Sequence, residues 1–239
     1  MDMQKLLGRS RAGGEGQDAH WLTVADLMAG LMMVFLFIAI ALMRSALQER
    51  DQIRELAVAY QDNQVAIYEA LLYEFEEDLP RWDAEIDEET LTFQFRSPEV
   101  LFERGSTDIS PRFEEILDDF IPRYLETLGD FEESIDEVRV EGHTSSEWRG
   151  QVSETEAYFL NMELSQGRTR SVLDYAYRLS TAEDRQEWVQ RQFAAVGFSS
   201  SRPVLDEIGE EDPEASRRVG FRVVTNSEIQ IRRILEEAQ

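Results

Sequence analysis

The 239-residue chain contains no cysteine, only two histidines and only one lysine. The absence of cysteine excludes disulfides, thiolate zinc sites and cysteine nucleophiles, and it leaves the redox compartment undecided. His20 and His143 are too few for a histidine-rich metal site, so we expect no bound metal. Because Lys5 is the only lysine, nearly all of the positive charge is arginine, whose planar guanidinium grips carboxylates. An arginine in a pocket would therefore indicate a carboxylate ligand.

Basic residues are also scarce as a class. The 24 arginine and lysine side chains stand against 49 aspartates and glutamates, which gives a formal net charge of -25. Such a charge repels the phosphates of nucleic acids and the headgroups of anionic lipids. We therefore expect no nucleic-acid partner.

Motifs of catalytic sites are missing as well. The stretch GGEG at residues 13–16 lacks the lysine and serine of a phosphate-binding loop, and the chain has no H-E-x-x-H. His143 has no partner at an obvious spacing, and we expect it to fix the turn after a strand. The chain is therefore expected not to be an enzyme and to need no cofactor.

One long apolar run is present in this acidic chain: WLTVADLMAGLMMVFLFIAIALM, residues 21–43. About 20 apolar residues in a helix cross the ~30 Å hydrocarbon core of a bilayer. We therefore predict a single transmembrane helix at residues 21–43. A secretory signal peptide is the alternative, but the run is long for one, contains Asp26 and ends without a small-x-small cleavage site.

The charges that flank the apolar run predict its orientation. Lys5, Arg9 and Arg11 precede it, so the positive-inside rule places residues 1–20 in the cytoplasm as a short tail. Two arginines soon after the run weaken this signal. The larger C-terminal part would then lie outside, in the periplasm of a Gram-negative bacterium, and the chain would be a single-pass inner-membrane protein.

Asp26 lies near the start of the apolar run, where a carboxylate is costly. An aspartate at the centre of a membrane helix costs on the order of 2.5–3.5 kcal/mol. One interpretation is a polar residue that pairs with a partner helix. The other is a carboxylate that alternately binds and releases a proton, driven by the transmembrane voltage, and the usual role of intramembrane ionisable groups favours it. Thr23 lies three residues earlier on the same helix face and is placed to hydrogen-bond along that path.

Residues 44–79 form a predicted helical connector, which Pro80 ends. Two arrangements fit its apolar spacing: a parallel dimer that packs along the seam, or a single amphipathic helix that lies on the following domain. The acidic side chains near the end of the connector predict a solvated face; they are Glu74, Glu76, Glu77 and Asp78. The apolar residues of the seam lie three or four apart for much of its length; they are Ile53, Leu56, Tyr60, Ile67 and Leu71.

The remainder, residues 80–239, is predicted to be one domain of the α+β class. Strand and helix patterns alternate along it, which predicts a two-layer arrangement with helices on one face of a sheet. The first long helix begins with a serine cap and a proline, at Ser110 and Pro111. The predicted strands are residues 91–96, 135–143 and 218–225, and the predicted helices are residues 110–128, 160–179, 183–193 and 227–237.

Four blocks of this domain stand in one order: VLFERGSTDISPRFEEIL, VRVEGHTSSEW, LNMELSQGRTRSVLDYA and ASRRVGFRVV. They resemble the motifs of the OmpA-like peptidoglycan-binding family. The resemblance implies a domain that binds the diaminopimelate part of a cell-wall stem peptide. By the same resemblance, Asn161, Leu164 and Arg168 occupy the helix positions of the binding site, with Thr144 and Arg218 bordering it.

The chemistry of these positions is consistent with that role. A guanidinium takes a free carboxylate through two hydrogen bonds, and Asn161 and Arg168 lie seven residues apart, two turns along one helix face. The alternative for these two residues is a helix cap and a salt bridge on a charged surface.

The chain departs from the family pattern at two positions. Ser145 replaces the aspartate that follows Thr144 in the family, and Ser216 replaces the asparagine of the last motif. The missing carboxylate weakens recognition of the ligand's ammonium group unless Glu147 or Glu141 substitutes for it. A stretch that resembles an insertion, RGQVSETEAYF, also separates the strand from the binding helix.

The whole arrangement, a short tail, one span with an aspartate, a connector and an OmpA-like domain, resembles the B subunits of rotary stator units. The segment WLTVADLMAGLMMVFLF is especially similar to the B components of Zorya anti-phage defence systems. This resemblance implies a homodimer inside a pentameric ring of a multi-span, MotA-like A subunit, with Asp26 as the proton carrier. Two alternatives remain: a flagellar MotB-type stator subunit, whose usual basic tail is not seen here, and a passive anchor between membrane and peptidoglycan.

Overall fold

The computed structural model describes residues 15–96, 98–180 and 183–226. Two compact units divide the chain, residues 1–55 and residues 56–239. The basic residues predicted to orient the tail and the predicted C-terminal helix at 227–237 lie outside the described residues.

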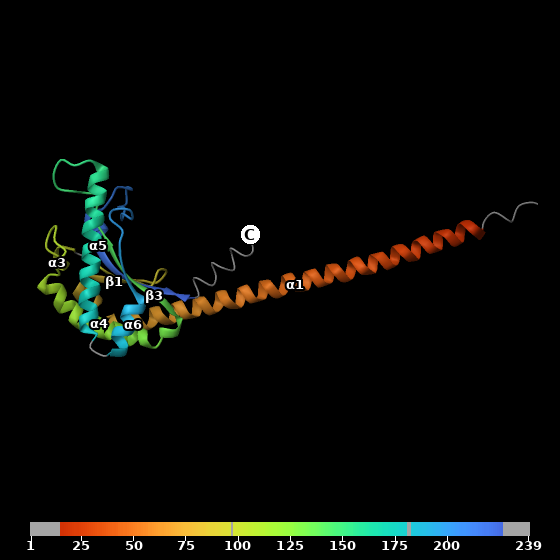
Figure 1. The fold of residues 1–239 in the computed structure, drawn as a ribbon, viewed down its shortest axis with the longest axis horizontal. Coiled ribbons are helices and arrows are strands. Elements are labelled where there is room, and N and C mark those ends of the chain that lie inside the picture. Colours follow the sequence, from red (N-terminus) through yellow and green to blue (C-terminus); the bar gives the residue numbers. More distant parts are fainter. Residues whose placement is uncertain (1–14, 97, 181–182, 227–239) are drawn as a thin grey trace, which may run out of the picture. The chain divides into compact units, whose positions relative to one another are not determined.

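The first unit consists of the N-terminal part of helix α1, which runs over Glu15–Phe75 (Figure 1). Its segment Val24–Asp51 contains an 18-residue window with a mean hydropathy of 2.4, and the segment is long and apolar enough to cross a membrane. Every side chain of this segment is exposed, so within the described residues nothing covers its apolar surface. The predicted apolar N-terminal helix and the helical connector are thereby confirmed.

The predicted end of the connector helix was wrong. Helix α1 ends at Phe75, and a short helix, α2, follows at Leu79–Trp82. Pro80 is therefore not the residue that ends α1, and it lies in the first turn of α2. A proline is tolerated there because the first N–H groups of a helix have no partner within the helix.

The second unit contains one five-stranded sheet among the described residues, in the order β1-β2-β5-β3-β4. Strands β3 and β4 are parallel, and the other neighbouring pairs are antiparallel. The strands are β1 Ala84–Asp87, β2 Thr92–Phe95, β3 Ile135–His143, β4 Phe193–Gly197 and β5 Arg218–Thr225. The predictions for β2, β3 and β5 are confirmed, whereas β1 and β4 had not been predicted.

Helices α4, α5 and α6 of the second unit correspond to three predicted helices, with one clear difference in their bounds, whereas the short helices α3 and α7 had not been predicted. The N-terminal cap of α4 is confirmed, because Ser110 Oγ accepts the N–H of Phe113 at 3.1 Å. Helix α5 begins six residues earlier than expected, so the second half of the apparent insertion forms its first turns, capped by Ser153. The helices are α3 Pro98–Leu101, α4 Pro111–Gly129, a 3-10 turn at Glu132–Ser134, α5 Glu154–Leu179, α6 Glu183–Gln192 and α7 Pro213–Ser216.

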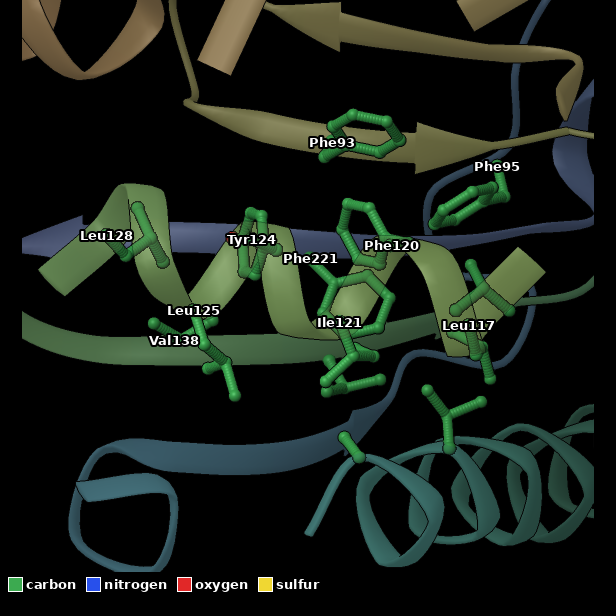
Figure 2. Close-up of a cluster of buried hydrophobic side chains, with 14 of the residues drawn as sticks. Phe93, Phe95, Leu117, Phe120, Ile121, Tyr124, Leu125, Leu128, Val138 and Phe221 are labelled. Atoms are coloured by element: carbon green, nitrogen blue, oxygen red, sulfur yellow. The ribbon is translucent and has the colours of Figure 1, made fainter. Parts of the chain in front are cut away.

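The hydrophobic core lies between helix α4 and one face of the sheet (Figure 2). The ring of Phe120 lies 4.6 Å from that of Phe93, 5.2 Å from that of Phe95 and 5.1 Å from that of Phe221, measured between centroids. Aromatic rings in such tilted and edge-on contacts contribute beyond the area that they bury. Helices therefore cover one face of the sheet, and the predicted two-layer α+β class is confirmed.

The last turns of α1 belong to this core. Ile67, Leu71 and Phe75 are fully buried, and the Phe75 ring lies 5.3 Å from the rings of both Phe93 and Phe120. Ile67 and Leu71 were candidates for the seam of a dimer, and for them that assignment was wrong. The alternative holds: this part of the connector lies on its own domain, because helical periodicity is the same for a seam and for a core-facing stripe.

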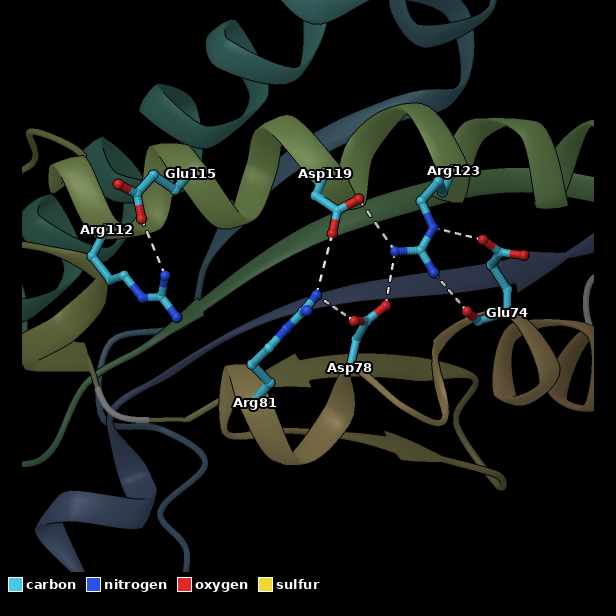
Figure 3. Close-up of polar contacts among 7 residues, drawn as sticks. All are labelled: Glu74, Asp78, Arg81, Arg112, Glu115, Asp119 and Arg123. Carbon is cyan, nitrogen blue, oxygen red and sulfur yellow. Dashed lines mark hydrogen bonds and ion pairs between the residues drawn. The ribbon is translucent and has the colours of Figure 1, made fainter.

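Two carboxylates near the end of α1 are paired rather than solvated, which corrects the prediction for them (Figure 3). Arg123 of α4 donates from Nε to Glu74 Oε1 at 2.6 Å and from Nη1 to Asp78 Oδ2 at 2.8 Å. Arg123 also donates to the backbone carbonyl of Glu74 at 2.7 Å and reaches Asp119 at 3.3 Å. Asp78 is buried and also pairs with Arg81. The network joins the end of α1 to α4.

Candidate functional site

The second unit contains a cavity of about 440 Å³ at the N-terminal half of α5. Three further segments complete its wall: the chain after α3, the loop after β3, and the residue before β5. A cavity of this size is typical of small-molecule sites. Its lining residues are Phe102, Arg104, Gly105, Thr144, Ser145, Glu147, Trp148, Arg149, Asn161, Leu164, Arg168 and Arg217.

Helix α5 brings three of the predicted site residues to this cavity. Asn161, Leu164 and Arg168 lie on one face of the helix, and all three line the cavity. The helix packs closely on the sheet because two strand residues lack side chains. A Cβ at Gly142 would lie 2.9 Å from Ser165 O, and a Cβ at Gly197 would lie 2.5 Å from Gln166 N.

Asn161 is buried and holds the loop that follows β3. Its Nδ2 donates to the carbonyl oxygens of Ser145 at 3.1 Å and Glu147 at 3.4 Å. The alternative of a helix cap was wrong for Asn161, because Ser153 caps α5 and Asn161 lies two turns further on. Asn161 therefore shapes the cavity wall by fixing the loop that forms it.

Arg168 is buried without a carboxylate partner among the described residues. Its Nε donates to Ser106 O at 2.9 Å and its Nη2 donates to Glu103 O at 3.3 Å, while the guanidinium carbon lies 4.8 Å from the ring centroid of Phe102. The alternative of a surface salt bridge was therefore wrong. Burial, together with the charge of Arg217, lowers the pKa of Arg168 to about 10, so the side chain still carries its proton at neutral pH.

Thr144 lines the cavity and has an unsatisfied hydroxyl. Its backbone N–H donates to Ser199 O at 3.0 Å, but its Oγ1 is buried and has no hydrogen-bond partner in the described part of the chain. Buried polar atoms without a partner are rare in folded proteins, and this hydroxyl can bond to a group or a water molecule that enters the cavity.

Arg218 does not line the cavity, although the sequence placed it at the border. Its guanidinium donates to the carbonyl oxygens of Ser216 at 3.1 Å and Arg202 at 3.3 Å. Its neighbour Arg217 lines the cavity instead, with Nη1 4.0 Å from Glu147 Oε2. Adjacent residues at the start of a strand point to opposite faces, so a shift of one position decides which arginine reaches the site.

The two candidates for the missing carboxylate differ in position. Glu147 lines the cavity, whereas Glu141 is buried elsewhere, 3.5 Å from His143 Nε2 and 3.8 Å from Arg202 Nη1. Burial opposes ionisation of Glu141, but the hydrogen bond and charge of His143, with nearby arginines, hold its pKa below the usual range. His143 stacks on Phe198, with ring centroids 5.1 Å apart.

Asp26, the candidate of the first unit, lies on α1 with its side chain exposed. It makes no ion pair within the part of the chain that is described. Gly30 follows one turn later, and nothing lies within 4 Å of the position that a Cβ would occupy there. Thr23 precedes Asp26 in the same helix, and its side chain lies outside the described set.

Comparison with known proteins identifies the family. A model of the OmpA family matches residues 101–217. Over 235 residues the chain is 53% identical to the Zorya protein ZorB of Escherichia coli, and the match covers 98% of this chain and 100% of that protein. The chain belongs to the ZorB family. Its C-terminal domain is thus an OmpA-family domain, as expected.

Solved structures that match this ZorB-family chain share little sequence with it. A MotB-like protein from Desulfovibrio vulgaris has a TM-score of 0.48 and 20% identity, and the match covers 72% of this chain and 94% of that one. The cell wall anchor of the T6SS from Pseudomonas aeruginosa has a TM-score of 0.45 and 21% identity, with coverages of 65% and 97%. The periplasmic domain of Helicobacter pylori MotB has a TM-score of 0.42 and 16% identity, with coverages of 65% and 90%.

Several lining residues of this ZorB-family cavity were missed by sequence reasoning. The quoted motif blocks contained most of them, but only the fold reveals which side chains reach the cavity. One signal was available: arginine in a pocket was expected to indicate a carboxylate ligand, and arginines recur in or beside the motif blocks. The missed residues are Phe102, Arg104, Gly105, Trp148, Arg149 and Arg217.

Proposed function

We propose that this chain is the B subunit of a proton-driven rotary motor of the stator type, anchored to peptidoglycan and acting in anti-phage defence. The observation that carries the motor assignment is Asp26. It is the only charged residue between Val24 and Met43, in a helix whose apolar surface has no cover within the described residues. A carboxylate is retained in such a segment at a cost, so it needs a function.

Asp26 is the proposed proton carrier, with Thr23 beside it on the path. A carboxylate that is alternately protonated and ionised moves one charge, and the membrane voltage contributes about 2.3 kcal/mol per charge per 100 mV. Gly30, one turn after Asp26, leaves room for a neighbouring helix to approach the carboxylate closely. A partner helix at this point would shield Asp26 from lipid.

The proposed assembly is a homodimer of this chain inside a pentameric ring of a multi-span A subunit, ZorA-like or MotA-like. The exposed apolar side chains of Val24–Asp51 supply a surface for such a ring and for lipid. In the proposed topology the N-terminus is cytoplasmic, the helix crosses the inner membrane once, and the OmpA-family domain lies in the periplasm.

Peptidoglycan is the proposed ligand of the cavity in that domain. Arg168 carries a buried positive charge without a carboxylate partner in the described residues, and Thr144 carries an unsatisfied hydroxyl. A carboxylate of a stem peptide would satisfy both needs. Asn161 and Leu164 complete the proposed binding residues. Arg217, and not Arg218, is the proposed arginine at the border of the site.

The motor assignment is tested by Asp26→Asn, with Asp26→Glu as the matched control. Both variants are expressed with the proposed multi-span A subunit and challenged with phage, and their membrane levels and their co-purification with that subunit are measured. We expect Asp26→Asn to abolish protection at unchanged assembly, and Asp26→Glu to retain part of it. Full protection by Asp26→Asn would leave a passive anchor as the function.

A swimming assay beside the phage challenge separates defence from the flagellar alternative. The 53% identity to a Zorya protein over almost the whole chain supports defence. A flagellar subunit would restore swimming to a strain without its own stator and would give no protection against phage.

A further inference from the structure

The charge of the cavity is opposite to that of the chain. Four arginines and one glutamate line it: Arg104, Arg149, Arg168, Arg217 and Glu147. In the whole chain, acidic residues outnumber basic residues two to one, 49 against 24. A random sample of this surface would therefore be acidic, and the cavity is a local concentration of guanidinium groups.

These guanidiniums are not neutralised by the chain itself. Arg168 donates only to backbone carbonyls, and Arg217 approaches a single carboxylate at 4.0 Å, the limit of an ion pair. Arg104 and Arg149 make no ion pair in the described ranges, residues 15–96, 98–180 and 183–226. Arg168 is buried, so its charge is costly without a counter-charge, and an anionic ligand would remove that cost; Arg104 and Arg149 are exposed and add positive charge at the cavity wall.

A cationic group of a ligand would find little here. The carboxylate of Glu147 is the only one in the lining, its side chain is 66% exposed, and Arg217 already lies beside it. An aspartate at position 145 would have added a second carboxylate, but the residue is serine. An ammonium group in the cavity would thus meet more positive than negative neighbours.

We propose that the cavity recognises a ligand through two or more carboxylates and does not require a free ammonium group. The ligand class is a stem peptide that ends in a dicarboxylic diamino acid, with the side-chain amine either free or already acylated by a cross-link. This proposal rests on the proposed binding of peptidoglycan. It extends that function by assigning specificity to Arg149, Arg217 and Ser145.

The test measures binding of three synthetic peptides to the full chain in nanodiscs by titration calorimetry. The parent is Ala-γ-Glu-diaminopimelate; the second has its side-chain amine acetylated, and the third has its side-chain carboxylate amidated. Acetylation should change the dissociation constant by less than about threefold, since the lining has no carboxylate placed to form a strong ion pair with the side-chain amine of the peptide. Amidation should weaken binding by about tenfold or more, since it removes charge-assisted hydrogen bonds.

Two variants sharpen the measurement. Ser145→Asp should introduce a preference of about tenfold for the free amine over the acetylated peptide, because it adds a carboxylate to the lining. Arg217→Gln should weaken the parent and acetylated peptides equally. Thermal unfolding of each variant verifies that the domain is folded.

The outcomes separate this proposal from the proposed function. If acetylation abolishes binding, or if amidation leaves it unchanged, the proposal is overturned while peptidoglycan binding stands. If the chain sediments with purified sacculi but binds none of the three peptides, the proposal is likewise overturned. If it binds neither sacculi nor peptides, peptidoglycan binding itself fails.

Discussion

Two partly or fully buried arginines of the same domain have opposite surroundings. Arg123 lies among three carboxylates, whereas Arg168 contacts backbone carbonyls and an aromatic ring. Burial lowers the pKa of Arg123, but hydrogen bonds to its carboxylates outweigh burial and raise it; the pKa of Arg168 falls to about 10. Removal of an arginine whose charge is balanced within the chain leaves its carboxylates unpaired and destabilises the fold, whereas an arginine whose charge is unbalanced is available to a ligand.

The largest expected effect concerns the balanced arginine. Arg123→Met should lower the free energy of unfolding by about 3 kcal/mol, because it leaves the buried carboxylate of Asp78 with only Arg81. Chemical denaturation measures the change, and binding to purified sacculi should be unaffected. Addition of Asp78→Asn should recover part of the loss; if it does not, the ion pair is not the cause.

The unbalanced arginine should give the reverse result. Arg168→Met keeps an apolar contact with Phe102 but removes the guanidinium, and we expect binding to sacculi to fall by about tenfold to a hundredfold. The free energy of unfolding should change by less than about 1.5 kcal/mol, since lost hydrogen bonds to two carbonyls are offset by relief of a buried charge. If Arg168→Met lost much stability but retained binding to sacculi, Arg168 would be a structural residue like Arg123 and the contrast between the two arginines would be wrong.

A third charged cluster predicts pH dependence. Burial lowers the pKa of His143, and His143, Arg222 and Arg202 lower that of Glu141 against the effect of burial. The folded domain then binds fewer protons than the unfolded chain, so its free energy of unfolding should fall as pH drops below the ordinary histidine value of 6.5. The slope should not exceed about 1.4 kcal/mol per pH unit for each group.

Urea denaturation at a series of pH values measures this dependence. His143→Gln should flatten the plot of the free energy of unfolding against pH just below pH 6.5. Protonation of Glu141 should still lower that free energy at more acidic pH. An unchanged curve in His143→Gln would exclude His143 as its source.

The smallest expected effect is at the exposed edge of the Arg123 network. Asp119 is 45% exposed and lies 3.3 Å from Arg123 and 3.5 Å from Arg81. Exposed ion pairs contribute little, so Asp119→Ala should cost about 0.5 kcal/mol. A cost as large as that of Arg123→Met would indicate that Asp119, and not Asp78, balances the arginine.

Local patterns predicted the elements whose cause is local. The alternation in β2 and the cap of α4 at Ser110 require only neighbouring residues, and so does the common face of Asn161 and Arg168. The motif blocks then placed four of the five predicted binding residues at one cavity.

Predictions failed where the cause lies far along the chain. The stripe that includes Ile67 and Leu71 gives no sign of what covers it, and Glu74 pairs with a residue 49 positions away. Strand β1 is only four residues long, and its pairing with β2 defines it. The choice between Arg217 and Arg218 depends on the register at which β5 begins, which neighbouring strands set.

The burial of Phe75 has a mechanical consequence. A pull on the last turns of α1 is resisted by Ile67, Leu71 and Phe75 together and by the Arg123 pairs, since these contacts are spread over about two helical turns. Detaching this end of α1 would require the loss of all of these contacts, so the helix is fastened to its own domain at several points rather than at one.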